Sequence, residues 1–178
     1  MAKANSINTG TTDREILQTR EFDAPRELVF EAWTAPEKIG QWWGPNGFTT
    51  TTDKMEFKPN GDWKFTMHGP DGTDYPNHIV YTRIEEPELL KYDHYGHRDE
   101  EGDPPHFKVT VIFEDLGGRT RLTMRMLFPS AQARNEAAEF GAIEGGQQTL
   151  NRLAHFLSNN PGATSREEFR IYNTDPIS

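Results

Sequence analysis

The chain has 178 residues, which fits one ordinary domain and leaves no room for a second full one. It carries 19 lysine and arginine residues against 28 aspartate and glutamate residues, so its formal net charge is −9. This charge argues against a role that depends on neutralising the phosphates of nucleic acid or anionic lipid. The absence of cysteine excludes disulfides, thiolate nucleophiles and cysteine-ligated metal centres.

The apolar residues are too dispersed for a membrane protein. No uninterrupted apolar run is longer than three residues, so the sequence contains neither a transmembrane helix nor the apolar segment of a signal peptide. We therefore expect a soluble, cytoplasmic protein that does not insert into membranes and does not bind nucleic acid.

The N-terminal part predicts a strand followed by a helix. Residues 1–14 are small and polar with little to pack, which is typical of a flexible leader. Residues 15–22 predict a short strand. Asp23 and Pro25 then predict the start of a helix over 25–33, with the aspartate as its cap and the proline in its first turn.

A second short helix is predicted next. Thr34 and Glu37 form a capping-box pattern, and the helix that they open would reach Trp42 and Trp43. Adjacent residues cannot face the same side of a regular helix. One of the two tryptophans should therefore lie in the core, and the other at the surface or at the mouth of a cavity.

From Met55 onward the apolar residues recur with a period of 2, which predicts antiparallel strands. The pair Asn60-Gly61 predicts a hairpin turn between the first two of them. The six strands expected after the first lie near residues 55–57, 63–67, 78–85, 89–95, 107–113 and 121–128. Because apolar and polar residues alternate along the last strand, one face of the sheet should be buried and the other wet.

A single long helix is predicted from Ser130 to Asn159. Its apolar stripe consists of Ile143, Gly146, Leu150, Leu153 and Leu157. On one continuous helix, Glu139, Ile143 and Gln147 would lie on the side that faces the sheet. The alternative is that the first turns overhang the sheet edge, which would leave Glu139 and Gln147 in water.

Gly145 and Gly146 are adjacent in this helix, where each costs about 1 kcal/mol relative to alanine. Gly146 belongs to the apolar stripe, so it either lets the helix approach the sheet closely or leaves room for a bound molecule. Gly145 is expected to point away from the stripe, and we attribute it to a bend.

Together these elements predict an α+β domain over residues 15–159. Its order is strand, helix, helix, six strands and helix, and a curved antiparallel sheet of about seven strands would wrap around the long C-terminal helix. Six segments also carry a family resemblance: residues 20–34, 36–37, 42–45, 60–63, 70–72 and 144–153.

These segments resemble the SRPBCC superfamily (START-like, Bet v 1-like). More narrowly, they are similar to the branch named after the C-terminal domain of the activator of the Hsp90 ATPase. The resemblance implies a helix-grip fold with an apolar cavity between the sheet and the long helix. Members of the superfamily bind lipids, hormones and polyketides, and some catalyse cyclisation, so the implied function is binding of a small apolar or aromatic ligand.

Two other functions stay open at this point. One is an enzyme that uses Tyr92, His94 or Glu139 as an acid or base on a molecule in the cavity. The other is a partner of an Hsp90-type chaperone, which rests on the resemblance alone. The eukaryotic co-chaperone has a separate N-terminal domain for which this chain has no room, so stimulation of an Hsp90 ATPase is not carried over to it. We favour binding without catalysis and assign no catalytic residue, since no nucleophile–base pair can be located.

The predicted ligand-binding residues are side chains expected to face the cavity: Trp43, Phe65, Met67, Tyr92, His94, Phe107, Met124, Glu139, Ile143, Gly146 and Gln147. For each apolar member, the simpler alternative is packing in the core. The polar members are more informative, because a polar group on a buried face must be hydrogen-bonded or must line an occupied or wet space.

No cofactor and no metal are expected. The glycine-rich turns lack the lysine or the third glycine of a phosphate-binding loop, and the serines form no Gly-x-Ser-x-Gly motif. His94 and His97, followed by acidic residues at 99–101, have the composition of metal ligands. Residues 97–105 nevertheless predict an acidic surface loop between two strands.

Residues 160–178 are predicted to lie outside the core. Phe169, Ile171 and Tyr172 alternate loosely with charged residues, which would suit an added strand at the sheet edge of a second copy and hence a homodimer. A plain flexible tail is the alternative.

Overall fold

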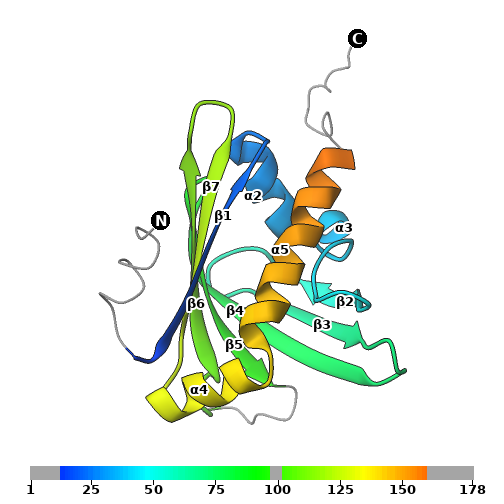
Figure 1. Ribbon diagram of the computed structural model, residues 1–178, viewed down its shortest axis with the longest axis vertical. Coiled ribbons are helices and arrows are strands. Elements are labelled where there is room, and N and C mark those ends of the chain that lie inside the picture. Colours follow the sequence, from blue (N-terminus) through cyan, green and yellow to red (C-terminus); the bar gives the residue numbers. More distant parts are fainter. Residues whose placement is uncertain (1–12, 97–101, 160–178) are drawn as a thin grey trace.

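The computed structural model describes residues 13–96 and 102–159. Its elements follow in the order β1 (Glu15–Phe22), α2 (Arg26–Thr34), α3 (Pro36–Ile39), β2 (Thr49–Met55), β3 (Asp62–His68), β4 (Asp74–Glu85), β5 (Leu89–Gly96), β6 (Phe107–Asp115), β7 (Thr120–Leu127), α4 (Ala131–Glu139) and α5 (Ala142–Asn159). The architecture is the expected α+β helix-grip fold, in which a curved seven-stranded sheet holds the C-terminal helix α5 on its inner face (Figure 1).

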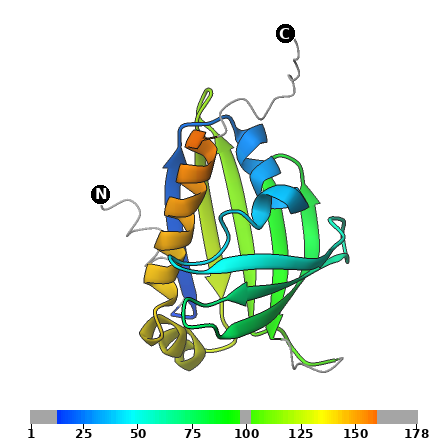
Figure 2. The same cartoon turned by 90° about the vertical axis from the view of Figure 1, so that its right-hand side faces the viewer.

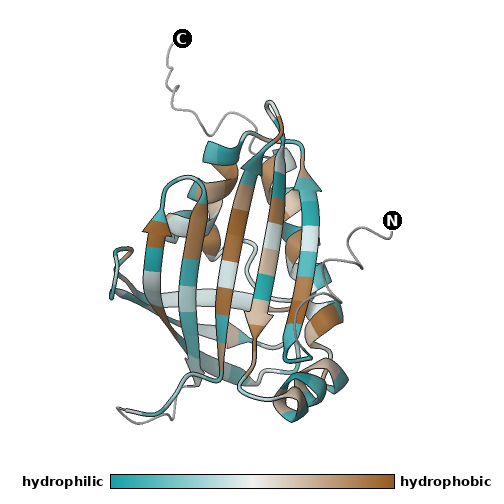
Figure 3. Cartoon of the chain, turned by 90° about the vertical axis from the view of Figure 1, so that its left-hand side faces the viewer, coloured by the Kyte–Doolittle hydropathy of each residue, from teal (hydrophilic) through white to brown (hydrophobic). Residues whose placement is uncertain are grey.

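The strands are ordered β1-β7-β6-β5-β4-β3-β2, and all neighbours are antiparallel. Strands β2 to β7 form an uninterrupted meander, whereas β1 pairs with β7, from Glu15 opposite Leu127 to Phe22 opposite Thr120. In Figure 2, α5 runs along one side of the inner face, and α2 and α3 cover its upper end. Figure 3 shows the outer face, where hydrophilic and hydrophobic residues alternate along the strands.

Alternation of apolar and polar residues explains which face of each strand is buried. In β3, Trp63 and Phe65 are buried while Lys64 between them is exposed. The hairpin before β3 turns at Asn60, whose φ of 69° lies in the left-handed region that asparagine tolerates. The hairpin and five of the six strands predicted after the first are therefore confirmed, whereas the strand predicted near 55–57 lies earlier in the chain, as β2 at Thr49–Met55.

The upper end of the fold is packed with aromatic rings from α2, the turn after α3, and the sheet. We refer to these rings as the aromatic cluster: Phe30, Trp33, Trp42, Trp63, Phe65 and Phe113, all at most 2% exposed. Trp33 meets Trp42 edge to face with ring centroids 5.1 Å apart, and Phe30 meets Phe113 in the same way at 5.2 Å. Such pairs each add about 0.5–1.5 kcal/mol to the free energy gained from burial.

The short helices begin and end differently from the prediction. The cap position of α2 is Pro25 and no side chain caps it, so Asp23 does not have the predicted role. Thr34 donates its hydroxyl to the carbonyl oxygen of Phe30 in the preceding turn, at 3.0 Å, and does not cap α3. α3 then ends at Ile39, short of the predicted end.

Trp42 and Trp43 lie in the turn that follows α3. Their backbone N–H groups both donate to the carbonyl oxygen of Ile39, at 3.4 and 3.1 Å. Trp42 is fully buried and donates its indole N–H to the carbonyl oxygen of Ala32, at 3.1 Å, whereas Trp43 is half-buried. This confirms that one tryptophan lies in the core and the other does not.

The predicted long helix is interrupted, which corrects the prediction of one helix from Ser130 to Asn159. Ser130 does begin the helical region, since its hydroxyl accepts from the N–H of Ala133 at 3.0 Å. α4 ends at Glu139, however, and Gly141 has a φ of 93°, which a regular helix cannot contain. α4 has no buried residue, whereas α5 buries Leu150, Leu153 and Leu157.

Candidate functional site

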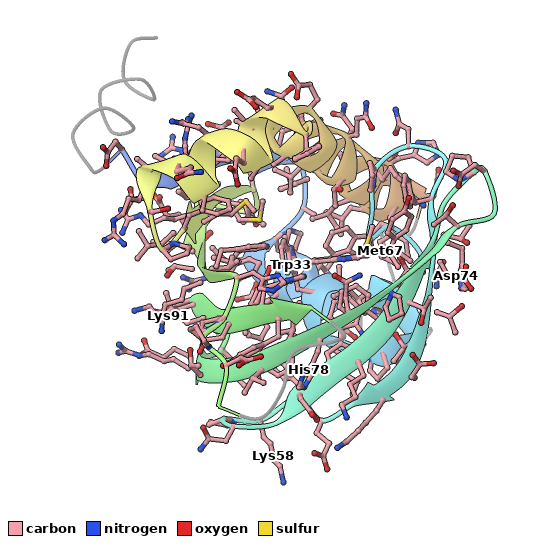
Figure 4. The ribbon with its side chains drawn as sticks, turned by 90° about the horizontal axis from the view of Figure 1, so that it is seen from below. Trp33, Lys58, Met67, Asp74, His78 and Lys91 are labelled. Atoms are coloured by element: carbon pink, nitrogen blue, oxygen red, sulfur yellow. The ribbon has the colours of Figure 1, made fainter. Side chains whose placement is uncertain are left out.

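A cavity of about 420 Å³ lies between the inner face of the sheet and α5. Its lining consists of Trp33, Trp43, Gly44, Pro45, Met67, Tyr92, His94, Phe107, Val109, Met124, Met126, Ala137, Phe140, Gly141, Ala142, Gly145, Gly146, Thr149 and Leu150. In Figure 4, Trp33 and Met67 lie inside the space that the sheet and the helices enclose, whereas Lys58, His78 and Lys91 lie outside it.

The wall formed by the sheet follows from strand register. Tyr92 and His94 lie on the inner face of β5, opposite Val109 and Phe107 of β6. The rings of His94 and Phe107 stack, with centroids 4.6 Å apart and planes 10° apart. Met126 of β7 lies opposite Val109, so three neighbouring strands supply one continuous wall.

The structure brings most of the predicted ligand-binding residues together. The lining contains Trp43, Met67, Tyr92, His94, Phe107, Met124 and Gly146 from the predicted set. Phe65 lies outside the lining; it is buried and stacks on Trp63, with ring centroids 3.8 Å apart.

Glu139, Ile143 and Gln147 also lie outside the cavity lining. Glu139 and Gln147 are exposed, which agrees with the alternative that both lie in water and not with the prediction that they face the sheet, whereas Ile143 is half-buried. The break at Gly141 removes Glu139 from the line of α5. Gln147 lies on the other side of the buried stripe from the cavity-lining Thr149.

Gly146 serves close packing between α5 and β1. A Cβ atom at this position would lie 2.1 Å from Oε1 of Gln18, which is 8% exposed. Gln18 also donates its Nε2 to the carbonyl oxygen of Ile143 at 2.8 Å, so its side chain cannot simply swing away. Of the two explanations for Gly146, the structure therefore favours close approach.

Gly145 lines the cavity, a position that the prediction of a bend did not give it. A Cβ atom here would meet only Cβ of Pro45, at an ordinary contact distance of 3.9 Å. Substitution of Gly145 therefore projects a side chain toward open space, whereas substitution of Gly146 creates a clash.

The loop after α3 forms another wall, and α5 holds it in place. Nη1 of Arg152 donates to the carbonyl oxygens of Gly44 and Pro45, at 2.8 and 3.0 Å. The N–H of Asn46 donates to Oε1 of Gln148 at 3.1 Å. Burial lowers the pKa of Arg152 from its ordinary value, and the carbonyl oxygens compensate for part of the water that the guanidinium has lost.

The few polar side chains of the lining limit what chemistry the cavity can perform. Burial, and to a smaller extent the neighbouring Tyr81, raises the pKa of Tyr92, so its hydroxyl is neutral at physiological pH and can donate a hydrogen bond. The hydroxyl of Thr149 donates to the carbonyl oxygen of Gly145 at 2.9 Å. Tyr92 and His94 are therefore the polar side chains best placed to orient a bound molecule.

Several lining residues were missed from the sequence. Met126 continues the alternation of Met124, a signal that would have found it. Phe140 is the single aromatic residue in an alanine-rich polar segment, whereas Gly44 and Pro45 lie in a loop that no periodicity describes.

Within residues 13–96 and 102–159, no group of three histidine or acidic residues could hold a metal ion. His97 of the metal hypothesis lies outside those residues.

One family and several solved structures match the chain. The sequence model of the family described as "Activator of Hsp90 ATPase homolog 1-like protein" matches residues 23–158. A search of curated proteins finds no match. Among the helices that the structure describes, none is long and apolar enough to cross a membrane.

The solved structures share the fold. A protein from Arthrobacter aurescens is 32% identical with a TM-score of 0.76, over 83% of this chain and 87% of that one. Protein Ms6760 from Mycobacterium smegmatis is 26% identical with a TM-score of 0.72, over 82% and 91%. The AHSA1 protein from Silicibacter pomeroyi is 22% identical with a TM-score of 0.65, over 82% and 99%, and at this identity the likeness shows the fold alone.

Proposed function

Because the chain belongs to the family of activator of Hsp90 ATPase homolog 1-like proteins, we propose that it binds a small apolar or aromatic molecule between the sheet and α5. The observation that carries this proposal is an apolar cavity of about 420 Å³ beside a closely packed core. Sites for small molecules typically measure roughly 300–1,000 Å³. The helix-grip fold of the family usually accommodates hydrophobic ligands.

The apolar lining suits a ligand whose shape it can adapt to. Met67, Met124 and Met126 have flexible, polarisable side chains that can follow an irregular surface. Trp43 and Phe107 offer flat aromatic surfaces. Binding would be driven by burial of apolar surface, at about 25 cal/mol for each Å² removed from water.

Tyr92 and His94 would give the ligand its orientation. The neutral Tyr92 hydroxyl can donate to a carbonyl or hydroxyl oxygen, which supports a ligand with one polar group at the β5 wall. The lining that the structure describes contains no serine, cysteine or carboxylate side chain. We therefore propose binding without catalysis.

A dye titration with two matched variants tests the proposal. Gly145→Leu places a side chain toward the cavity without a backbone clash, and Gln147→Leu places the same side chain on the exposed side of α5. We expect the neutral dye N-phenyl-1-naphthylamine to bind wild type and Gln147→Leu equally. Gly145→Leu should bind it at least about tenfold more weakly, a loss of about 1.4 kcal/mol.

Native mass spectrometry of the purified protein provides a second measurement. A co-purifying hydrophobic molecule that is absent from Gly145→Leu would support binding in the cavity. Equal dye affinity in all three proteins would locate the dye elsewhere and contradict the proposal, as would the absence of dye binding by wild type.

A further inference from the structure

Phe140 is highly exposed and also lines the cavity. Its side chain is 91% exposed, far more than the other large exposed apolar residues of the described chain, Tyr75 at 45% and Ile112 at 39%. Phe140 nevertheless belongs to the lining of the cavity, at the junction of α4 and α5. A large apolar side chain at the rim of an apolar cavity gains free energy when a ligand covers it.

The backbone next to Phe140 can accommodate a change in direction. Gly141 has a φ of 93°, and a Cβ atom built on it would meet nothing within 4 Å. α4 on its other side has no buried residue and is tied to β1 by the hydrogen bond from Nε of Arg134 to the carbonyl oxygen of Glu15, at 3.0 Å. This rim is therefore lightly anchored, and few contacts oppose its movement.

The opposite rim of the cavity is held firmly. Arg152 and Gln148 of α5 bind the loop that contains Gly44, Pro45 and Asn46 through three hydrogen bonds. Any adjustment of the cavity to a ligand is thus easier on the side of α4, which lies across one end of the sheet in Figure 1.

We propose that Phe140 is a ligand-binding residue that folds over the molecule in the cavity and slows its release. This rests on the proposed function. The ring would cover the part of the ligand nearest α4, and that part is therefore apolar and uncharged. The polar group of the ligand would lie at Tyr92 and His94, which also line the cavity.

The test compares Phe140→Ala with Ile112→Ala, which removes an exposed apolar side chain from β6 outside the cavity lining. Dissociation of N-phenyl-1-naphthylamine is followed by stopped flow. We expect Phe140→Ala to release the dye about tenfold faster, with an unchanged melting temperature because the side chain is exposed. Phe140→Leu should retain part of the effect, and Ile112→Ala should behave as wild type.

Amide hydrogen exchange on the wild-type chain gives an independent readout. Saturating dye should slow exchange in residues 136–142 and leave the exposed β3–β4 turn at 69–73 unchanged. Equal release rates for wild type and Phe140→Ala, with binding still lost in Gly145→Leu, would overturn the role of Phe140 and leave the proposed function intact.

Two further results would also overturn the inference. Absence of dye binding by wild type would remove the proposed function and the role of Phe140 with it. A lower sedimentation coefficient for Phe140→Ala would show that the ring packs against a second copy of the chain instead of a ligand.

Discussion

The two ends of the space between sheet and helices are built from different residues. At the end near α2, the aromatic cluster fills the interior with rings in edge-to-face contact. At the end near α4, methionines, glycines and the exposed Phe140 surround a cavity. The comparison shows how one small domain combines a closely packed core with a space for a ligand, since the packed end contributes stability that the open end does not.

The largest expected effect comes from opening the packed end. Trp42→Ala should lower the free energy of unfolding by about 3–5 kcal/mol, because Trp42 is fully buried and its indole N–H is bonded to Ala32. Urea unfolding measures the loss. Met124→Ala at the cavity should cost less than half as much, and equal losses would show that the two ends are packed alike.

The next effect concerns the contact between α5 and β1. Gly146→Ala should lower the free energy of unfolding by about 1–3 kcal/mol, because its Cβ would clash with the buried Gln18 side chain. Combining it with Gln18→Ala should remove the clash, so the double variant should be more stable than the sum of the two losses implies.

Gly145→Ala is the matched control for that prediction. Its Cβ meets nothing closer than Pro45, so the better helix propensity of alanine should leave the protein as stable or up to about 1 kcal/mol more stable. If both alanine variants destabilised the protein equally, the assignment of one glycine to packing and the other to the cavity would fail.

The smallest effect is expected on the outer face, away from both ends. Burial tends to raise the pKa of Asp62, but hydrogen bonds from His78 and Lys54 outweigh it, so the pKa is lowered. The ionised carboxylate therefore stabilises the fold above its ordinary pKa of about 4, and this contribution is lost as pH falls through the lowered value. Asp62→Asn should cost at most about 1 kcal/mol at pH 7.

Urea unfolding of wild type and Asp62→Asn at pH 7 and at pH 2.5 checks this sign. The difference between the two proteins should shrink at the lower pH. A difference that stayed constant would come from packing and not from charge.

The sheet wall of the cavity was easier to predict than the wall formed by α4 and α5. Period-2 alternation marks the inner face of β5, so Tyr92 and His94 were found from the sequence. β2 was largely missed, because its run of threonines has no apolar alternation. Tertiary contacts hold it instead: Thr50 donates its hydroxyl to the carbonyl oxygen of Trp43, and Thr52 accepts from the indole N–H of Trp63.

The wrong assignment of Glu139 and the omission of Phe140 have one physical origin. The prediction assigned the faces of one continuous helix over residues 130–159, but the chain changes direction at Gly141 and α5 begins after it. Glu139 was therefore assigned to a face that it does not occupy, and Phe140 was overlooked. A single glycine in an alanine-rich segment gives no periodic signal of a break, because alanine fits either side of a helix.

The pairing of the first strand with the last has a consequence for how the domain is made. β2 to β7 pair with sequence neighbours and can assemble as hairpins while the chain emerges, but β1 needs β7, with Phe22 opposite Thr120. β1 therefore cannot pair until β7 has been synthesised, and α5, which contacts β1, follows β7 in the chain. Until then the edge of β7 stays uncovered, and this long-range closure is expected to limit the rate of folding.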